Sequence, residues 1–356
     1  MMYTKYILLF MLSVAACNKS DDPIKPDLQD SMYFPPLANS AWETAYPKDL
    51  GWDETALQTL YTFLDDHHTK AFMVLVNGRI VVEKYFNGHT ASATWKWNSA
   101  GKTLVGSSIG IAQHEGLLSV NDPVSKYLGA GWTSAPNEKE NLITIRHLLT
   151  MSSGLNEQYE YLTMQNLSYV ADAGTRWAYH NVFQLLMDVI DSASDLSFEG
   201  YFNSRIRDKI GMEGFWNNGL IFRIYNSNAR SMARFGLLAL NKGKWENEQI
   251  IQEDFFNESI RSSQNLNPAY GFFWWLNGKS SYMVPSGQGV YPGFLVPNAP
   301  EGMYAAMGAA DQRIYVIPDK KMVIIRLGDD TDIAQPGFAI SGFDNIFWEK
   351  FNEVIL

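Results

Sequence analysis

The sequence predicts a mixed α/β domain of the α+β type, in which an antiparallel sheet built from both chain ends is flanked by helices. Three observations predict it. Two β-rich runs flank an Asn-Gly pair near the start of the chain. A similar pair of runs lies near its end, and three-to-four-residue apolar spacing dominates between them. The 356 residues, 46% of them hydrophobic, suffice for a sizeable core.

Residues 1–17 have the pattern of a secretory signal peptide. Lys5 precedes the apolar run YILLFMLSVAA, which is too short to span a membrane and ends in small residues. The run stops at VAAC, which resembles the lipobox of bacterial lipoproteins, whose cysteine is acylated. Cys17 is the only cysteine of the chain. We therefore expect lipidation at Cys17, no disulfide, and a protein anchored in the bacterial cell envelope, facing either the periplasm or the exterior.

Residues 18–45 are polar and contain proline, which predicts a flexible tether, and the folded domain is expected over 46–356. In AFMVLVNGRIVVEKYF, Asn77-Gly78 predicts a type I′ hairpin turn, because both residues tolerate positive φ. RIYVIP and KMVIIRLG, around 318–321, predict a second hairpin.

The segments between these hairpins predict helices, so a mostly helical insertion is expected over about 103–260. Gly116, Gly154 and Gly211 stand where a C′ glycine would end a helix. The helical segments read GKTLVGSSIGIAQHEG, TIRHLLTMSSG, NVFQLLMDVIDSAS and FEGYFNSRIRDKIG.

The charge balance disfavours nucleic acid as a partner. The net charge is −10 and the pI is near 5.1, whereas phosphate binding requires clustered lysine and arginine. The six histidines show no metal-ligand spacing, and the chain lacks a phosphate-loop motif. We predict no metal and no cofactor; the oligomeric state stays open.

The stretch WNSAGKT places Ser99 three residues before Lys102 at the expected start of a helix. Residues i and i+3 share a helix face, so the two side chains can meet. A serine hydroxyl becomes a good nucleophile when a base takes its proton, and lysine can be that base if its pKa is lowered. The alternative is a helix-capping serine beside a solvated lysine.

A second pair, Tyr179 and Asn181 in RWAYHN, lies just before another expected helix. Two further Y-x-N matches, at 85–87 and 201–203, fall in the first hairpin and inside an amphipathic helix, and we interpret both as structural. In an extended segment His180 points away from its two neighbours, so it is also expected to be structural.

With these motifs, the chain resembles the serine β-lactamase-related superfamily, which includes class C β-lactamases, penicillin-binding DD-peptidases and esterases. GIAQHEGLLSVNDPVSKYL, ITIRHLLTMSSGL and SMARFGLLALNKGKW also resemble family segments in the family's order. The resemblance implies a β-lactamase/transpeptidase-like fold. It implies Ser99 as nucleophile, Lys102 in its proton network, Tyr179 as general base and acid, and Asn181 as a substrate contact.

The resemblance also implies two backbone N–H groups for the oxyanion, one from Ser99 and one from the late strand at Ala309 and Ala310. This strand departs from the family. Members that recognise penicillin carry K-T-G or H-x-G there, whereas this chain reads MGAADQRIYV over 307–316. Arg313 and Arg176 are possible substitutes for the missing cation.

The departure favours an esterase or amidase, acting on a small ester, amide or cell-wall-like substrate, over a β-lactamase or DD-peptidase. The alternative is a catalytically weak protein that binds penicillin or peptidoglycan fragments.

A competing nucleophile is Ser108, because Gly106 to Gly110 fits the G-x-S-x-G pattern of α/β-hydrolases. That motif requires a strand, a sharp turn and then a helix. The preceding KTLV continues a helical pattern instead, so we do not expect Ser108 to be catalytic.

Overall fold

The computed structural model describes residues 31–37, 41–218, 222–333 and 342–355. The chain divides into two units, Met1–Met32 and Tyr33–Leu356, and the second carries every element described below. The predicted signal peptide, with Cys17, and the tether as far as residue 30 lie outside the described residues.

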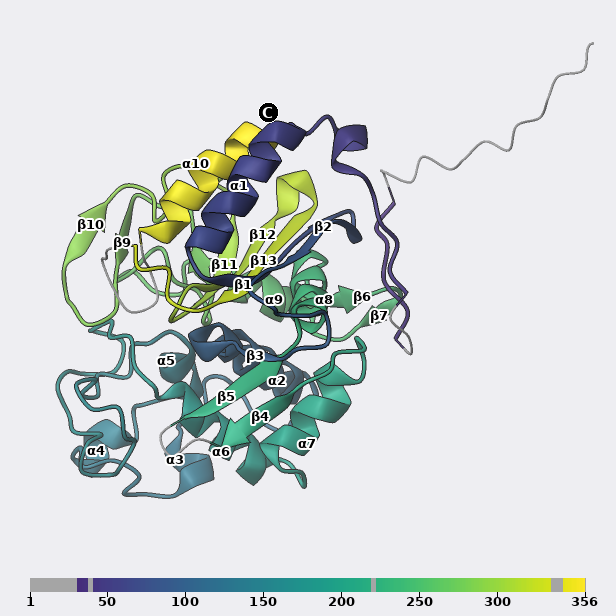
Figure 1. Cartoon of the computed structure of the whole chain (residues 1–356). Helices are drawn as coiled ribbons and strands as arrows, with labels where there is room; N and C mark the ends of the chain where they lie inside the picture. Colours follow the sequence, from purple (N-terminus) through teal and green to yellow (C-terminus); the bar gives the residue numbers. More distant parts are fainter. Residues whose placement is uncertain (1–30, 38–40, 219–221, 334–341, 356) are drawn as a thin grey trace, which may run out of the picture. The chain divides into compact units, whose positions relative to one another are not determined.

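A six-stranded antiparallel sheet joins the two ends of the second unit (Figure 1). One strand of the first hairpin pairs directly with one strand of the last, which confirms the predicted sheet. In sheet order the strands are β2 (Arg79–Tyr85), β1 (Thr69–Val76), β13 (Met322–Gly328), β12 (Gln312–Ile317), β11 (Tyr304–Gly308) and β8 (Trp275–Leu276).

The turn between β1 and β2 has the backbone that its sequence predicts. Asn77 and Gly78 have φ values of 48° and 81°, both in the left-handed region. A Cβ on Gly78 would lie 1.8 Å from the Tyr33 carbonyl oxygen. Glycine is therefore required there both by the turn and by the chain that crosses it.

Helices cover both faces of the sheet. Figure 1 shows α1 (Glu54–Asp66) and α10 (Phe343–Ile355) side by side over one face. On the other face, α8 (Ala229–Leu240) packs against β13, β12 and β1. A Cβ on Gly236 would lie 2.4 Å from Val323 Cγ1, so α8 approaches β13 closely because it presents a glycine. Burial of these apolar faces forms the main core.

The insertion is largely helical, as predicted, but two of its strands form a small sheet with a strand that precedes it, in the order β3-β5-β4. The strands of this sheet are β3 (Trp95–Lys96), β5 (Arg223–Ser227) and β4 (Phe215–Asn218). The helices of the insertion are α2 (Lys102–His114), α3 (Ser125–Leu128), α4 (Asn137–Glu140), α5 (Ile145–Leu149), α6 (Phe183–Ala193), α7 (Phe198–Phe202) and α9 (Glu253–Ser259). Short hairpins β6 (Lys244–Trp245) with β7 (Glu248–Gln249), and β9 (Ser281–Met283) with β10 (Val290–Pro292), complete the fold.

Part of the segment expected to be a tether is bound to the folded unit. The Arg234 guanidinium donates to the carbonyl oxygens of Pro35 (3.3 Å) and Pro36 (2.7 Å). Trp42 Nε1 donates to Gly78 O at 2.7 Å, and Ala45 N to Ile80 O at 2.9 Å. The folded unit therefore starts at Tyr33 rather than near Tyr46.

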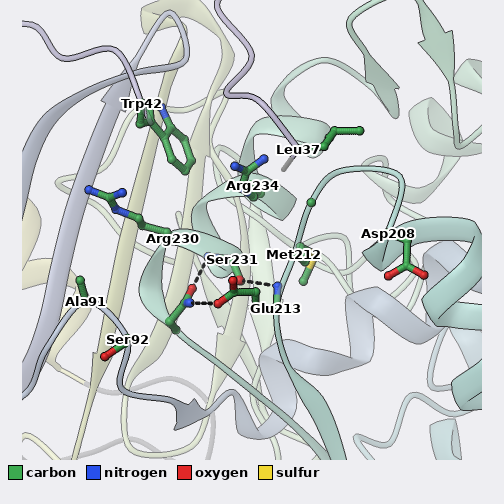
Figure 2. Close-up of a pocket in the computed structure, with 12 residues that line it drawn as sticks. Leu37, Trp42, Ala91, Ser92, Asp208, Met212, Glu213, Arg230, Ser231 and Arg234 are labelled. Atoms are coloured by element: carbon green, nitrogen blue, oxygen red, sulfur yellow. Dashed lines mark hydrogen bonds between the residues drawn. The ribbon is translucent and has the colours of Figure 1, made fainter. Parts of the chain in front are cut away.

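Figure 2 shows Arg234 beside Trp42. Both residues line a crevice of about 640 Å³. Arg230 also lines the crevice, but it forms an ion pair with Glu83. Ser99, Lys102 and Tyr179 do not line this crevice, so it is distinct from the predicted site.

Among the described residues, no helix is long and apolar enough to cross a membrane.

Candidate active site

Ser99 and Lys102 meet at the junction between a 3₁₀ turn and α2. The turn spans Asn98–Gly101, and α2 begins at Lys102. This local backbone places Lys102 Nζ 2.7 Å from Ser99 Oγ, within hydrogen-bond distance. Ser99 is half-buried and Lys102 is only 2% exposed. The structure thus shows a buried lysine bonded to the serine, and not a solvated lysine.

The surroundings of Lys102 are aromatic rather than anionic. Its Nζ lies 4.7 Å from the ring centre of Tyr179 and 4.4 Å from that of Phe183. Burial lowers the pKa of Lys102 from 10.5 to about 7, since desolvation disfavours the ammonium. A substantial neutral fraction at neutral pH makes this amine a competent base for the neighbouring hydroxyl.

Tyr179 is the third side chain at this point. Its ring stacks on Trp275 at 5.8 Å and meets Tyr270 edge-on at 6.1 Å, which fixes the ring from two sides. Burial raises the pKa of Tyr179 well above its usual value, although a hydrogen bond with Ser99 opposes the shift. The phenol is therefore protonated at neutral pH and able to donate.

A cavity of about 110 Å³ opens beside Ser99 and Lys102. Of the residues predicted to contact the substrate, Asn181 and Ala309 line the cavity and Ala310 does not. His180 is buried and also outside the lining. The complete lining comprises Asn98, Ser99, Lys102, Asn181, Phe183, Phe222, Arg223, Ile224 and Ala309.

The end of β11 lies against the nucleophile's backbone. A Cβ on Gly308 would lie 2.4 Å from the Trp97 carbonyl oxygen and 3.1 Å from the Ser99 nitrogen. This approach is possible only without a side chain, so Gly308 brings the turn at 309–311 next to Ser99. The backbone amides of Ser99 and of the turn are thereby in neighbouring segments.

Neither arginine considered as a substitute cation is available to a substrate. Arg313 is fully buried, and its guanidinium pairs with Asp344 at 2.6 Å and with Asp311 at 2.6 Å. Arg176 forms a two-pronged ion pair with Glu157. The positions before Gly308 are Ala306 and Met307, both buried strand residues.

Ser108 lies in the middle of α2 and is fully buried. Its hydroxyl donates to the Leu104 carbonyl at 2.9 Å, within the same helix. The strand-turn-helix context of a nucleophile elbow is absent at this position, in agreement with the sequence analysis.

Five lining residues were not predicted: Asn98, Phe183, Phe222, Arg223 and Ile224. Asn98 and Phe183 lie one and two residues from predicted site residues, and this closeness along the chain could have identified them. The other three come from the approach to β5 and its first residues, a short strand without a clear sequence pattern. Within the described ranges, no group of three or more His, Cys, Asp or Glu side chains is arranged to hold a metal.

The chain is similar to several known proteins. An uncharacterised protein from Alkalihalophilus pseudofirmus is 24% identical over 292 residues, which cover 71% of this chain and 81% of that protein. A structure from Bacillus anthracis, provisionally named 6-aminohexanoate-dimer hydrolase, has a TM-score of 0.67 and 20% identity, covering 91% of this chain and 88% of that one. EstCE1, a hydrolase with promiscuous acyltransferase activity, has a TM-score of 0.64 and 13% identity, covering 87% and 99%.

At these identities the solved structures establish the fold alone. The family model described as Beta-lactamase matches residues 62–336. Since this match spans well over half of the chain, the protein belongs to the β-lactamase family.

Proposed function

We propose that the protein is a serine hydrolase that cleaves small, uncharged esters or amides through an acyl-enzyme at Ser99. The observation that carries the proposal is the 2.7 Å contact between Ser99 Oγ and a buried Lys102 whose pKa is lowered to about 7. A base held at hydrogen-bond distance, with a pKa near the working pH, is what activation of a serine requires.

In the proposed acylation, neutral Lys102 takes the proton of Ser99 while Oγ bonds to the acyl carbon. Collapse of the tetrahedral intermediate breaks the bond to the leaving group, which receives a proton from the Tyr179 phenol. Lys102 then returns its proton to Tyr179, so acylation leaves both side chains neutral. In deacylation, water attacks the acyl carbon and the same groups return a proton to Ser99.

The proposed substrate class follows from the size and charge of the cavity. Its 110 Å³ is less than the ~150 Å³ of an apolar cavity that holds benzene, so a short acyl group fits best. Phe183, Phe222 and Ile224 supply apolar walls. Arg223 is paired with Asp188 at 2.7 Å, which leaves its charge compensated.

The comparisons support this choice in part. The family's members are typically serine hydrolases, and EstCE1 is named as a hydrolase with acyltransferase activity. The Bacillus anthracis relative is named for hydrolysis of an aminohexanoate dimer.

The test uses p-nitrophenyl esters of increasing acyl length, with Ser99→Ala as the inactive form and Ser108→Ala as the matched control. We expect turnover that is fastest with short acyl groups, loss of turnover in Ser99→Ala, and retention in Ser108→Ala. Turnover of the pure Ser99→Ala protein at the wild-type rate would rule the mechanism out.

We expect kcat/KM to rise with pH and reach half its plateau near pH 7, since only neutral Lys102 accepts the proton.

A second candidate is a binding protein with little turnover. It is favoured by one observation, that the stretch 307–316, where penicillin-recognising relatives carry K-T-G or H-x-G, contains no lysine or histidine. Intact-mass measurement after a fluorophosphonate probe and, separately, benzylpenicillin distinguishes the two. A probe adduct on Ser99 supports the hydrolase, whereas saturable ligand binding with no adduct supports the binding protein.

We further propose that the mature protein is held at the cell envelope by lipid on Cys17, as the lipobox-like VAAC indicates. The mass of the membrane-extracted protein, compared with that of a Cys17→Ala variant, tests this anchor.

A further inference from the structure

Asn98 links the nucleophile's segment to the 309–311 turn. It precedes Ser99 directly, and its Nδ2 donates to the Ala309 carbonyl oxygen at 2.7 Å. The two residues are 211 positions apart in the chain. The side chain is half-buried and lines the cavity beside Ser99. This bond therefore joins the two segments that carry the proposed oxyanion donors.

The backbone of Asn98 suits a polar side chain at this position. Its φ of 49° is in the left-handed region, where asparagine, aspartate and glycine are tolerated best. Asparagine alone among these three offers an amide donor. Asn98 thus adopts the backbone conformation that the turn before Ser99 needs. It also supplies the hydrogen-bond donor for Ala309 O.

Side chains from β12 and β13 also donate to the carbonyls of residues 308–311, and one of these bonds, from Gln312 Nε2 at 3.4 Å, reaches Ala309 O. Arg313 Nη1 donates to Gly308 O at 2.8 Å, and Gln312 Nε2 to Ala310 O at 2.7 Å. Arg326 Nη1 donates to Asp311 O at 2.9 Å. Among the described side chains that donate to these carbonyls, Asn98 is the one that belongs to the nucleophile's segment.

These bonds also orient the amide of Ala309. A peptide unit is planar and trans, so its C=O and N–H point in opposite directions. Because Arg313 holds Gly308 O, the Ala309 N–H of the same unit points away from that guanidinium. Asn98 holds the next unit through Ala309 O. Both peptide units that meet at Ala309 are thereby fixed.

We propose that Asn98 is a positioning residue for the oxyanion site, which fixes the turn's amides at a constant separation from the Ser99 amide. The inference rests on the proposed function. Preorganised donors act mainly on the transition state, so loss of the bond lowers kcat more than it changes KM. Asn98 itself transfers no proton.

The experiment compares Asn98→Gly and Asn98→Asp with the wild type in ester hydrolysis and in the rate of fluorophosphonate labelling. Both variants tolerate the positive φ and remove the donor. We expect kcat to fall about 10- to 100-fold, KM to change less than about threefold, and the labelling rate to fall by the same factor as kcat. In Asn98→Gly the midpoint of the pH profile should stay near that of the wild type, because this variant adds no charge beside Ser99 and Lys102.

The matched control is Asn226→Asp, which removes a half-buried asparagine amide that donates to Ile224 O at 3.0 Å on β5. We expect wild-type kcat in this variant. Wild-type kcat in Asn98→Gly would overturn the inference while leaving the proposed function standing, and an equal loss in Asn226→Asp would overturn it as well. A wild-type protein that neither hydrolyses esters nor takes the probe would overturn both.

Discussion

Lys102 and Arg313 are both fully buried cations within the same domain, and their surroundings differ. Lys102 faces a hydroxyl and two aromatic rings, and burial lowers its pKa to about 7. For Arg313, burial alone would lower the pKa, but the carboxylates of Asp344 and Asp311 raise it overall. A buried cation without a counter-charge becomes a base, whereas one between two carboxylates becomes a permanent structural link.

Removal of the base should give the largest effect. Lys102→Met retains volume and burial but has no amine, so we expect kcat/KM for a short ester to fall roughly 10³-fold, about 4 kcal/mol of transition-state stabilisation. Steady-state kinetics measure it. Lys96→Met, which changes an exposed lysine on β3, is the control and should keep wild-type kinetics. A fully active Lys102→Met would assign the base to another group.

Loss of an ion pair at Arg313 should lower the stability of the fold. Asp344→Asn removes one of the two carboxylates that face the guanidinium, and the free energy of unfolding should fall by about 3 kcal/mol. Urea unfolding measures it. The exposed Asp319→Asn should be neutral. If Asp344→Asn unfolds at the wild-type urea concentration, the buried pair contributes little net stability.

The pH dependence of stability should distinguish the two cations further. Between pH 7 and 10.5 the unfolded chain binds a proton on Lys102 that the folded chain lacks, so this residue makes stability rise with pH. The unfolding free energy of the wild type minus that of Lys102→Met should increase by roughly 1 kcal/mol for each pH unit from 7 to 9. Urea unfolding of both proteins at pH 7, 8 and 9 measures this difference. A difference that stays constant from pH 7 to 9 would mean that Lys102 is charged in the folded chain as it is in the unfolded chain.

Local signals predicted much of the fold. The turn at Asn77-Gly78 depends on two adjacent residues, and the helix after Ser99 depends on spacing within one segment. The sheet of β3, β5 and β4 was not predicted, because its strands have two to five residues and carry no clear alternation. The ordered residues at 33–36 were also missed, since Arg234 binds their backbone carbonyls rather than side chains of a recognisable pattern.

The candidate site was likewise predicted in part, from spacing and family resemblance, and missed in part. The meeting of Ser99 with Lys102 follows from i to i+3 spacing, and the place of Tyr179 and Asn181 from family resemblance. The role of Arg313 could not be read from the sequence, because nothing in its neighbours along the chain reveals the pairing with Asp344 on α10. Long-range contacts of this kind depend on the complete fold.

The hydrogen bonds from Arg234 to the carbonyl oxygens of Pro35 and Pro36 have a consequence for proteolytic cleavage of the chain. Proteases act on backbone that can leave the surface, and these carbonyls are held by Arg234, a residue that is only 5% exposed. A shortened protein that begins at Tyr46 would leave the Arg234 guanidinium without two of its acceptors. Limited proteolysis should therefore leave the chain uncut at Pro35 and Pro36, and a soluble form suited to crystallisation should retain Tyr33.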